Sequence, residues 1–117
     1  MKVGIIGLGF VGLTFASVLG SKNYSTLGFD SDKKKSSQIK NGKPPFYEPH
    51  LEETLNQALQ KGLKITDNIA TIVKSCQIIF VTVGTPQSDD GSINLSMIKS
   101  VFGEIGKQLR ESRNKPI

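Results

Sequence analysis

The sequence predicts an α/β fold, in which helices flank a parallel β-sheet, and three observations lead to this expectation. Residues 3–6 form a short, uninterrupted apolar run, which is typical of a strand buried on both faces of a sheet. Further apolar runs alternate with segments of helical periodicity along the chain. A glycine-rich turn joins the first run to the first helical segment. Strands that alternate with helices give a parallel sheet with right-handed crossovers, and we count about four strands.

The turn at residues 7–12 has the spacing G-x-G-x-x-G. Gly7 allows a tight turn, Gly9 lets a pyrophosphate approach the backbone, and Gly12 lets the next helix pack close to the strand. The amino terminus of that helix offers free N–H groups and the positive end of its dipole to phosphates. Because the turn follows a strand and opens a helix, it indicates a Rossmann-type dinucleotide-binding domain.

Asp30 stands 18 residues after Gly12, directly after a second apolar run, and strengthens this interpretation. An acid at this place accepts hydrogen bonds from the ribose hydroxyls of an adenosine and disfavours a 2′-phosphate. The sequence therefore predicts NAD, rather than NADP, as the cofactor. The alternative is an ordinary tight turn followed by a surface Asp.

The first half of the chain continues with two further helices and a break between them. The helix after the glycine turn is expected to place three apolar residues on one face: Phe15, Val18 and Leu19. A short helix is expected between Ser31 and a stop signal at Asn41-Gly42, and two adjacent prolines at 44–45 then hold the chain extended. Pro49 is expected in the first turn of the next helix. That helix shows leucines at four-residue steps: Leu51, Leu55 and Leu59.

The second half of the chain supplies two strands and two helices. Residues 63–65 are expected to form a short strand, and Thr66-Asp67 is expected to cap a small helix. The next strand, Gln77–Val83, contains a run at 78–81 that we expect to be buried on both faces. A turn then stands at the carboxyl end of this strand, where open α/β sheets bind ligands: Gly84, Thr85 and Pro86. Asn94 is expected to cap a last helix that buries six apolar residues: Leu95, Ile98, Val101, Phe102, Ile105 and Leu109.

The composition limits the classes of function. The 117 residues carry a net charge of +5, and the basic residues lie mainly at 33–35 and near the C-terminus without interleaved aromatic residues. We therefore favour solvated helix faces over a nucleic-acid surface. The single cysteine, Cys76, is expected in or near the core and fits a reducing, cytoplasmic setting. One histidine, His50, and the pair Asp89-Asp90 give no metal-ligand pattern. Five glycines interrupt the apolar N-terminal segment, so neither a signal peptide nor a membrane span is expected.

Three motifs, in order along the chain, resemble one known family: Gly7-x-Gly9-Phe10-Val11-Gly12-Leu13, Tyr47-Glu48-Pro49-x-Leu51, and Val83-Gly84-Thr85-Pro86 followed by Asp90-Gly91. The chain resembles the N-terminal NAD-binding domain of the UDP-glucose/GDP-mannose dehydrogenase family over essentially its whole length. The middle and third motifs make the resemblance much more specific than the glycine turn alone. His50 is a departure, since such proteins usually have Gly after Glu-Pro. It raises a question about the local backbone angle, and we expect a surface or capping residue rather than a catalytic base.

The resemblance implies a set of cofactor contacts. Three residues would lie under the pyrophosphate: Phe10, Val11 and Gly12. Asp30 would hold the adenosine ribose, and Lys35 would help to position the adenosine end. Thr85, on its turn with Gly84 and Pro86, would hydrogen-bond the cofactor near its nicotinamide side. The alternatives are one more solvated lysine for Lys35 and a turn-forming hydroxyl for Thr85.

The resemblance also implies an activity. Enzymes of this family oxidise the C6 alcohol of a nucleotide sugar to the carboxylate in two NAD-dependent steps, and UDP-glucose is the expected substrate. Their nucleophilic cysteine and most of their UDP-sugar site belong to a later domain, so no catalytic residue is expected in 1–117, which should be inactive alone. We expect a fragment of a homo-oligomeric protein, without the substrate and dimerisation domains, because Asn114–Ile117 leads toward a further strand. The alternatives are a stand-alone NAD-binding or sensing module and the cofactor domain of a β-hydroxyacid dehydrogenase.

Overall fold

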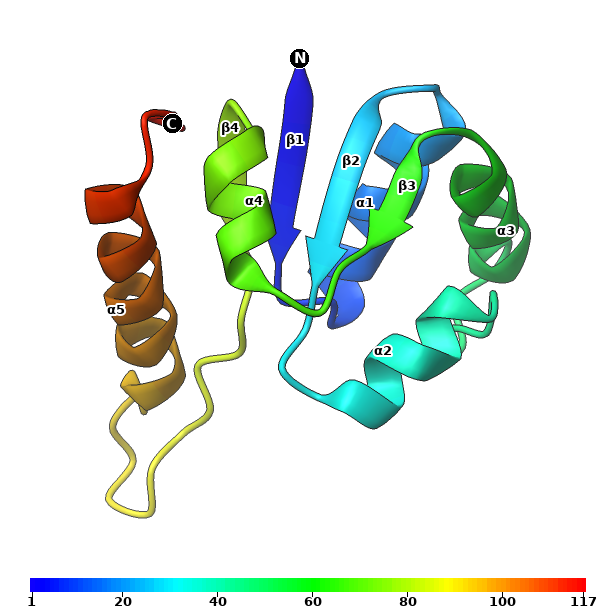
Figure 1. Cartoon of the computed structure of the whole chain (residues 1–117). Coiled ribbons are helices and arrows are strands. Elements are labelled where there is room, and N and C mark those ends of the chain that lie inside the picture. The colour runs from blue at the N-terminus through cyan, green and yellow to red at the C-terminus, as the bar shows by residue number, and fades with distance from the viewer.

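A computed structural model describes residues 1–117, and its centre is a four-stranded parallel sheet. The strand order is β3-β2-β1-β4, which is the order of the first four strands in a dinucleotide-binding fold (Figure 1). The strands are β1 (Lys2–Ile6), β2 (Ser25–Phe29), β3 (Leu63–Ile65) and β4 (Ile78–Val81). The helices are α1 (Phe10–Ser21), α2 (Lys33–Lys40), α3 (Leu51–Lys61), α4 (Ile69–Ser75) and α5 (Ser96–Glu111). The predicted α/β Rossmann-type fold is therefore confirmed.

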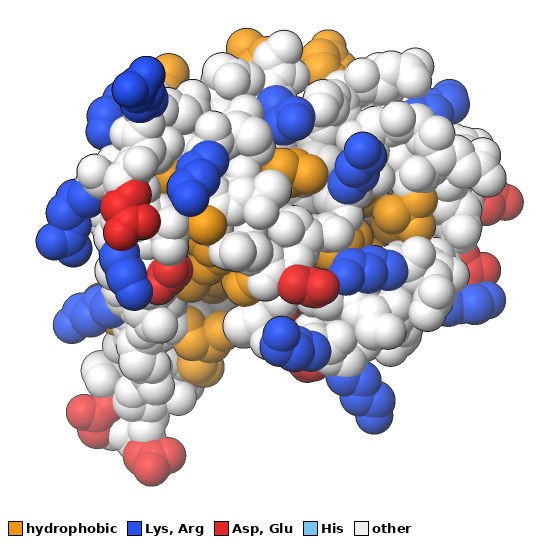
Figure 2. Space-filling view, viewed as in Figure 1, with side chains coloured by type: hydrophobic (Ala, Val, Ile, Leu, Met, Phe, Trp, Pro, Cys, Tyr) orange, Lys and Arg blue, Asp and Glu red, His pale blue; other side chains and the backbone are white.

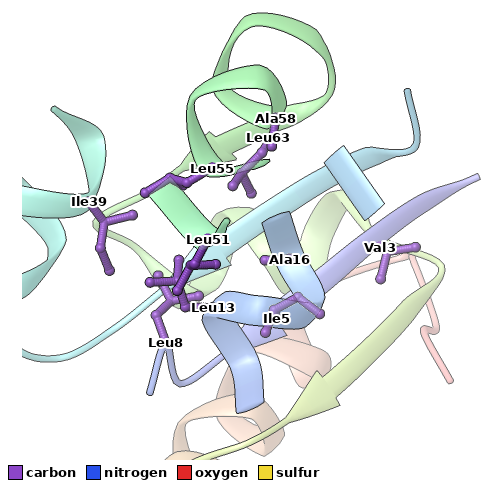
Figure 3. Packing of buried hydrophobic residues seen from close by; sticks show 10 residues of the cluster. All are labelled: Val3, Ile5, Leu8, Leu13, Ala16, Ile39, Leu51, Leu55, Ala58 and Leu63. Atoms are coloured by element: carbon purple, nitrogen blue, oxygen red, sulfur yellow. The ribbon is translucent and has the colours of Figure 1, made fainter. Parts of the chain in front are cut away.

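Each face of the sheet carries its own hydrophobic core. In Figure 1, α4 lies in front of the strands and α1 lies behind them. The core behind the sheet joins α1, α2 and α3 to β1 and β3, and Figure 3 shows its side chains converging: Val3, Ile5, Leu8, Leu13, Ala16, Ile39, Leu51, Leu55, Ala58 and Leu63. The core in front joins α4 and α5 to β1 and β2, and Cys76 lies within it, fully buried. The expectation of a core cysteine is confirmed, and burial raises the pKa of its thiol.

Helix α1 begins at Phe10, so the last glycine of the turn lies inside its first turn. Phe15 and Leu19 pack against the core, as expected. Val18 lies in the same helix but is 40% exposed, so it adds little to this core. The buried stripe instead uses small residues beside Leu13, which allow the helix to lie close to the sheet: Gly12, Ala16, Ser17 and Gly20.

Strand β4 is shorter and more exposed than its sequence indicated. The run at 78–81 was expected to be buried on both faces, but none of its residues is fully buried and Phe80 is 40% exposed. The reason is its position, because β4 is the outer strand beside β1. The backbone of Ile117 makes two hydrogen bonds to this outer edge, of 2.7 Å from the Ile79 N–H and 2.8 Å to the Gln77 carbonyl. This is the pattern of a parallel bridge.

Three expected helix starts differ in detail. Pro49 lies in a turn outside α3, and His50 occupies the N-cap position. Helix α4 is capped by Asn68, whose side chain accepts from the Ala70 N–H at 2.9 Å, and not by Thr66-Asp67. Leu95 occupies the N-cap position of α5, and the side chain of Asn94, one residue earlier, accepts from the Ser96 N–H at 2.9 Å.

Helix α5 buries only part of its apolar stripe. Ile105 is buried, and Val101 and Leu109 pack against the front core. Leu95 and Phe102 are 45% and 54% exposed, so their expected burial was wrong. The helix contacts the rest of the domain through α4, and this contact covers only one side of it (Figure 1).

The surface carries dispersed charge. Lys and Arg side chains are spread over the visible face in Figure 2, and apolar side chains show in the hollow beside α5. None of the five helices is both long enough and apolar enough to span a bilayer.

Candidate dinucleotide-binding site

A cleft of about 760 Å³ opens at the carboxyl ends of β1, β2 and β4. This is the point where the strand order reverses, because β2 follows β1 on one side and β4 lies on the other. Open α/β sheets bind their ligands at such a switch point. The volume is within the usual range for a small-molecule site. The lining comes from four segments: Ile6, Gly7 and Gly9; Phe29 to Asp32 and Lys35; Thr82 to Gly84; and Ser96, Met97, Ser100 and Val101.

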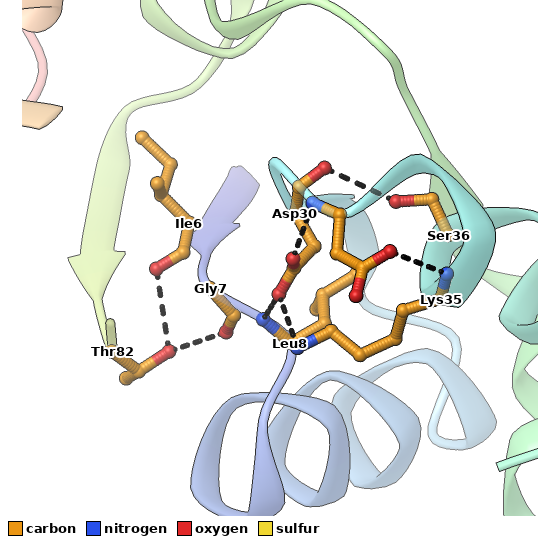
Figure 4. A network of polar contacts seen from close by, with 8 residues as sticks. Ile6, Gly7, Leu8, Asp30, Lys35, Ser36 and Thr82 are labelled. Carbon is orange, nitrogen blue, oxygen red and sulfur yellow. Dashed lines mark hydrogen bonds and ion pairs between the residues drawn. The ribbon is translucent and has the colours of Figure 1, made fainter. Parts of the chain in front are cut away.

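The glycine turn is held from both neighbouring strands. Gly7 has a φ of +101°, which glycine adopts without strain. Its N–H donates to the Phe29 carbonyl at the end of β2, at 2.8 Å, and the Thr82 hydroxyl donates to its carbonyl at 2.7 Å. The next N–H, of Leu8, donates to the Asp30 carboxylate at 2.8 Å. Figure 4 shows Thr82 and Asp30 on opposite sides of this segment.

Gly12 is required for the close approach of α1 to the turn. A Cβ at this position would lie 1.9 Å from the Gly7 carbonyl oxygen and 2.4 Å from the Thr82 Oγ1 atom. No side chain could occupy that space without a shift of the helix. The close approach of helix and strand that the sequence predicted for Gly12 is present.

The amino terminus of α1 presents unpaired donors. Gly9 is its N-cap and supplies no side-chain cap, and the first turn contains no acidic residue. The N–H groups of Phe10, Val11 and Gly12 donate to no group in the chain. A Cβ at Gly9 would meet only open space, so the backbone there is accessible. Free N–H groups at the positive end of a helix dipole fit an anion such as a pyrophosphate.

The Asp30 carboxylate lines the cleft together with Asp32 and Lys35, and its side chain is 9% exposed. Its Oδ2 atom accepts from the Leu8 N–H and lies 2.9 Å from the Lys35 ammonium, while Oδ1 accepts only from the Asp32 N–H, at 2.9 Å. Burial raises the pKa of Asp30, but the hydrogen bonds from Lys35, Asp32 and Leu8 outweigh it and hold the pKa below its usual range. Asp30 is therefore ionised at neutral pH, and Oδ1 can accept one further hydrogen bond.

The structure brings five of the ten predicted cofactor-binding residues into the lining of this cleft: Gly7, Gly9, Asp30, Lys35 and Gly84. The other five lie outside the lining: Phe10, Val11, Gly12, Thr85 and Pro86. The ring of Phe10 packs against the ring of Phe46, with the ring centroids 5.1 Å apart. Thr85 and Pro86 are exposed beyond the end of β4.

A comparison with protein families gives one match, to the NAD-binding domain of the UDP-glucose/GDP-mannose dehydrogenase family, over residues 1–114. The chain belongs to this family. It is the family's NAD-binding domain, which confirms the expected cofactor. The alternative of a β-hydroxyacid dehydrogenase is thereby set aside.

Individual relatives and solved structures agree with this assignment. The chain is 36% identical over 116 residues to the GDP-mannose 6-dehydrogenase of Pseudomonas syringae pv. tomato, covering 98% of this chain and 26% of the relative. It is 32% identical over 113 residues to the UDP-glucose 6-dehydrogenase of Pseudomonas aeruginosa, covering 96% and 25%. A crystal structure of GDP-mannose dehydrogenase from P. aeruginosa superposes with a TM-score of 0.94 at 34% identity, covering 99% and 27%. The chain thus spans about a quarter of the length of the proteins it matches.

Sequence reasoning missed several residues of this family domain's cleft. Thr82 was included in the predicted strand and was not assigned to the site. Its position at the carboxyl end of a parallel strand could have indicated a place in the binding cleft, because ligands bind at that edge of the sheet. The α5 wall was missed because sequence alone does not say which side of a helix faces a cleft: Ser96, Met97, Ser100 and Val101.

The structure shows which backbone angle His50 adopts at the position where it departs from the family pattern. Its φ is +67°, in the left-handed region that favours glycine. Its side chain is 86% exposed and 4.0 Å from the Glu53 carboxylate. The structure therefore gives His50 a left-handed backbone angle, and it confirms a surface residue at a helix start.

Proposed function

We propose that this domain is the cofactor-binding part of a longer enzyme, a nucleotide-sugar 6-dehydrogenase that oxidises the C6 alcohol of UDP-glucose to the carboxylate in two NAD-dependent steps. One observation carries the proposal. The unpaired N–H groups at the start of α1 lie beside the same cleft as the ionised Asp30, in a domain of this dehydrogenase family.

Each part of the cleft has a role in this proposal. The N–H groups of Phe10, Val11 and Gly12 would bind the pyrophosphate, and the free acceptor site on Asp30 would bind a ribose hydroxyl. Lys35 would hold the Asp30 carboxylate in place through their 2.9 Å ion pair. The turn at 84–86 would lie toward the nicotinamide end. NAD, when bound, would supply the hydride acceptor, and this domain would supply one side of the arrangement that sets it against a substrate carbon.

GDP-mannose is a second candidate substrate. The superposition on a GDP-mannose dehydrogenase, with a TM-score of 0.94, and the 36% identity to a GDP-mannose 6-dehydrogenase favour it. Both candidates are alcohols at C6 of a sugar joined to a nucleoside diphosphate, so the cofactor domain would play the same part for each.

The test is an assay of the complete protein with each nucleotide sugar, following the NADH that forms. The proposal expects turnover of UDP-glucose with two NADH per sugar and no turnover with NADP. Turnover of GDP-mannose but not of UDP-glucose would show that the proposed substrate is wrong and that the proposed C6 oxidation is right. NAD binding without turnover of either sugar would support a stand-alone NAD-binding or sensing module instead.

A further inference from the structure

The peptide unit between Gly7 and Leu8 is fixed at both of its polar ends by side chains from other strands. Its carbonyl accepts from the Thr82 hydroxyl at 2.7 Å, just beyond β4. Its N–H donates to the Asp30 carboxylate at 2.8 Å, just beyond β2. Because a peptide unit is planar, these two contacts together determine its rotation (Figure 4).

The Thr82 hydroxyl is the only group in the structure that donates to the Gly7 carbonyl. Gly12 packs closely against this oxygen, since a Cβ at Gly12 would lie 1.9 Å from it. The backbone of Thr82 is itself anchored, because its N–H donates to the Ile6 carbonyl at 2.8 Å. The hydroxyl lies 2.7 Å from the Gly7 carbonyl and 3.4 Å from the Ile6 carbonyl, so the sheet presents it with the first glycine of the turn as its closer acceptor.

We propose that Thr82 is a positioning residue for the cofactor, which sets the glycine turn for pyrophosphate binding and, through the same peptide unit, sets the Asp30 carboxylate. This inference rests on the proposed NAD site. A Thr82 without its hydroxyl leaves a partly buried carbonyl unpaired, and the Gly7–Leu8 peptide rotates toward another donor. This rotation withdraws the Leu8 N–H from Asp30. It also moves the amino terminus of α1, because α1 begins two residues after Leu8.

The test compares the affinity for NAD and the stability of four chains by calorimetric titration and urea unfolding. Thr82→Val removes the hydroxyl at nearly constant shape, and Thr82→Ser retains it. Thr26→Val is the matched control, because Thr26 is a buried threonine on β2 whose hydroxyl donates to the Tyr24 carbonyl at 2.9 Å, at the opposite end of the sheet from the cleft. We expect Thr82→Val to raise the Kd for NAD about tenfold, and Thr82→Ser to stay within about threefold of the wild type.

The control separates positioning from stability. Thr26→Val should lower the unfolding midpoint as Thr82→Val does, yet leave the Kd for NAD unchanged. If Thr82→Val binds NAD as tightly as the wild type, or if Thr26→Val weakens NAD equally, the positioning role is wrong.

Two further measurements test the link through the peptide unit. Amide hydrogen exchange of Leu8 without NAD should be faster in Thr82→Val than in the wild type and unchanged in Thr26→Val. Thr82→Val should raise the Kd for NAD by a smaller factor in an Asp30→Asn background than in the wild type, because both substitutions act on the same peptide unit. Additive losses, or an unchanged exchange rate at Leu8, would overturn the link. A wild-type chain that binds no NAD would refute the proposed site, while the exchange rate would still decide whether Thr82 orders the turn.

Discussion

Asp30 serves the fold and the proposed cofactor site through the same carboxylate. It fixes the Leu8 N–H of the glycine turn and the Asp32 N–H before α2, and it pairs with Lys35 inside that helix. These contacts leave one acceptor position on Oδ1. A ribose hydroxyl would therefore meet a carboxylate whose direction the fold has already determined.

The lowered pKa of Asp30 predicts a pH dependence of stability. Because the folded chain holds the pKa below its unfolded value of about 3.9, the ionised group stabilises the fold above that pH, and this stabilisation is lost as the pH falls through the folded-state pKa. We expect the difference in unfolding free energy between wild type and Asp30→Asn to shrink below about pH 4. Urea unfolding across that range measures it. A difference in unfolding free energy that stays constant over this pH range would contradict the lowered pKa of Asp30.

At the scale of elements, the contact between α1 and the glycine turn has no spare volume. Gly12→Ala would place a methyl group 1.9 Å from a backbone oxygen, so we expect it to destabilise the domain by about 2–4 kcal/mol. Gly103→Ala is the matched control, because a Cβ there meets nothing and α5 should gain about 0.5–1 kcal/mol from the better helix former. Thermal and urea unfolding report both values. Equal effects of the two substitutions would mean that α1 is not locked against the turn.

The start of α3 carries a local backbone strain at His50. His50 holds a φ of +67° with no side-chain cap, and a left-handed angle costs a residue other than glycine about 1–2 kcal/mol. We expect His50→Gly to stabilise the domain by up to about 1 kcal/mol, since glycine also gains freedom in the unfolded chain. Asn23, with a φ of +69°, is the comparison, because Asn tolerates this region and Asn23→Gly should gain less. A loss of stability for His50→Gly would show that the histidine side chain contributes to the helix start.

At the scale of the whole molecule, a parallel sheet brings the ends of three strands to one edge, and the cleft forms there. Much of this was predictable from sequence. Three features depend only on local chemistry and can therefore be identified in the sequence: the glycine spacing, the acid after the second apolar run, and the alternation of strand and helix periodicity.

The remaining features depend on which elements become neighbours. Phe80 is exposed because β4 lies at the edge of the sheet, and an apolar run does not state its position in the strand order. The hydroxyl of Thr82 acquires its role only when β4 pairs with β1 and brings it to Gly7, which is 75 positions away. The α5 wall of the cleft likewise follows from packing between distant helices.

A calorimetric titration of this chain with NAD and with NADP tests the proposed cofactor site. We expect saturable binding of one NAD per chain. We expect NADP to bind at least about tenfold more weakly, because the ionised Asp30 disfavours a 2′-phosphate at the ribose position. Equal affinity for the two dinucleotides would contradict the role of Asp30, and no binding of either would contradict the site itself.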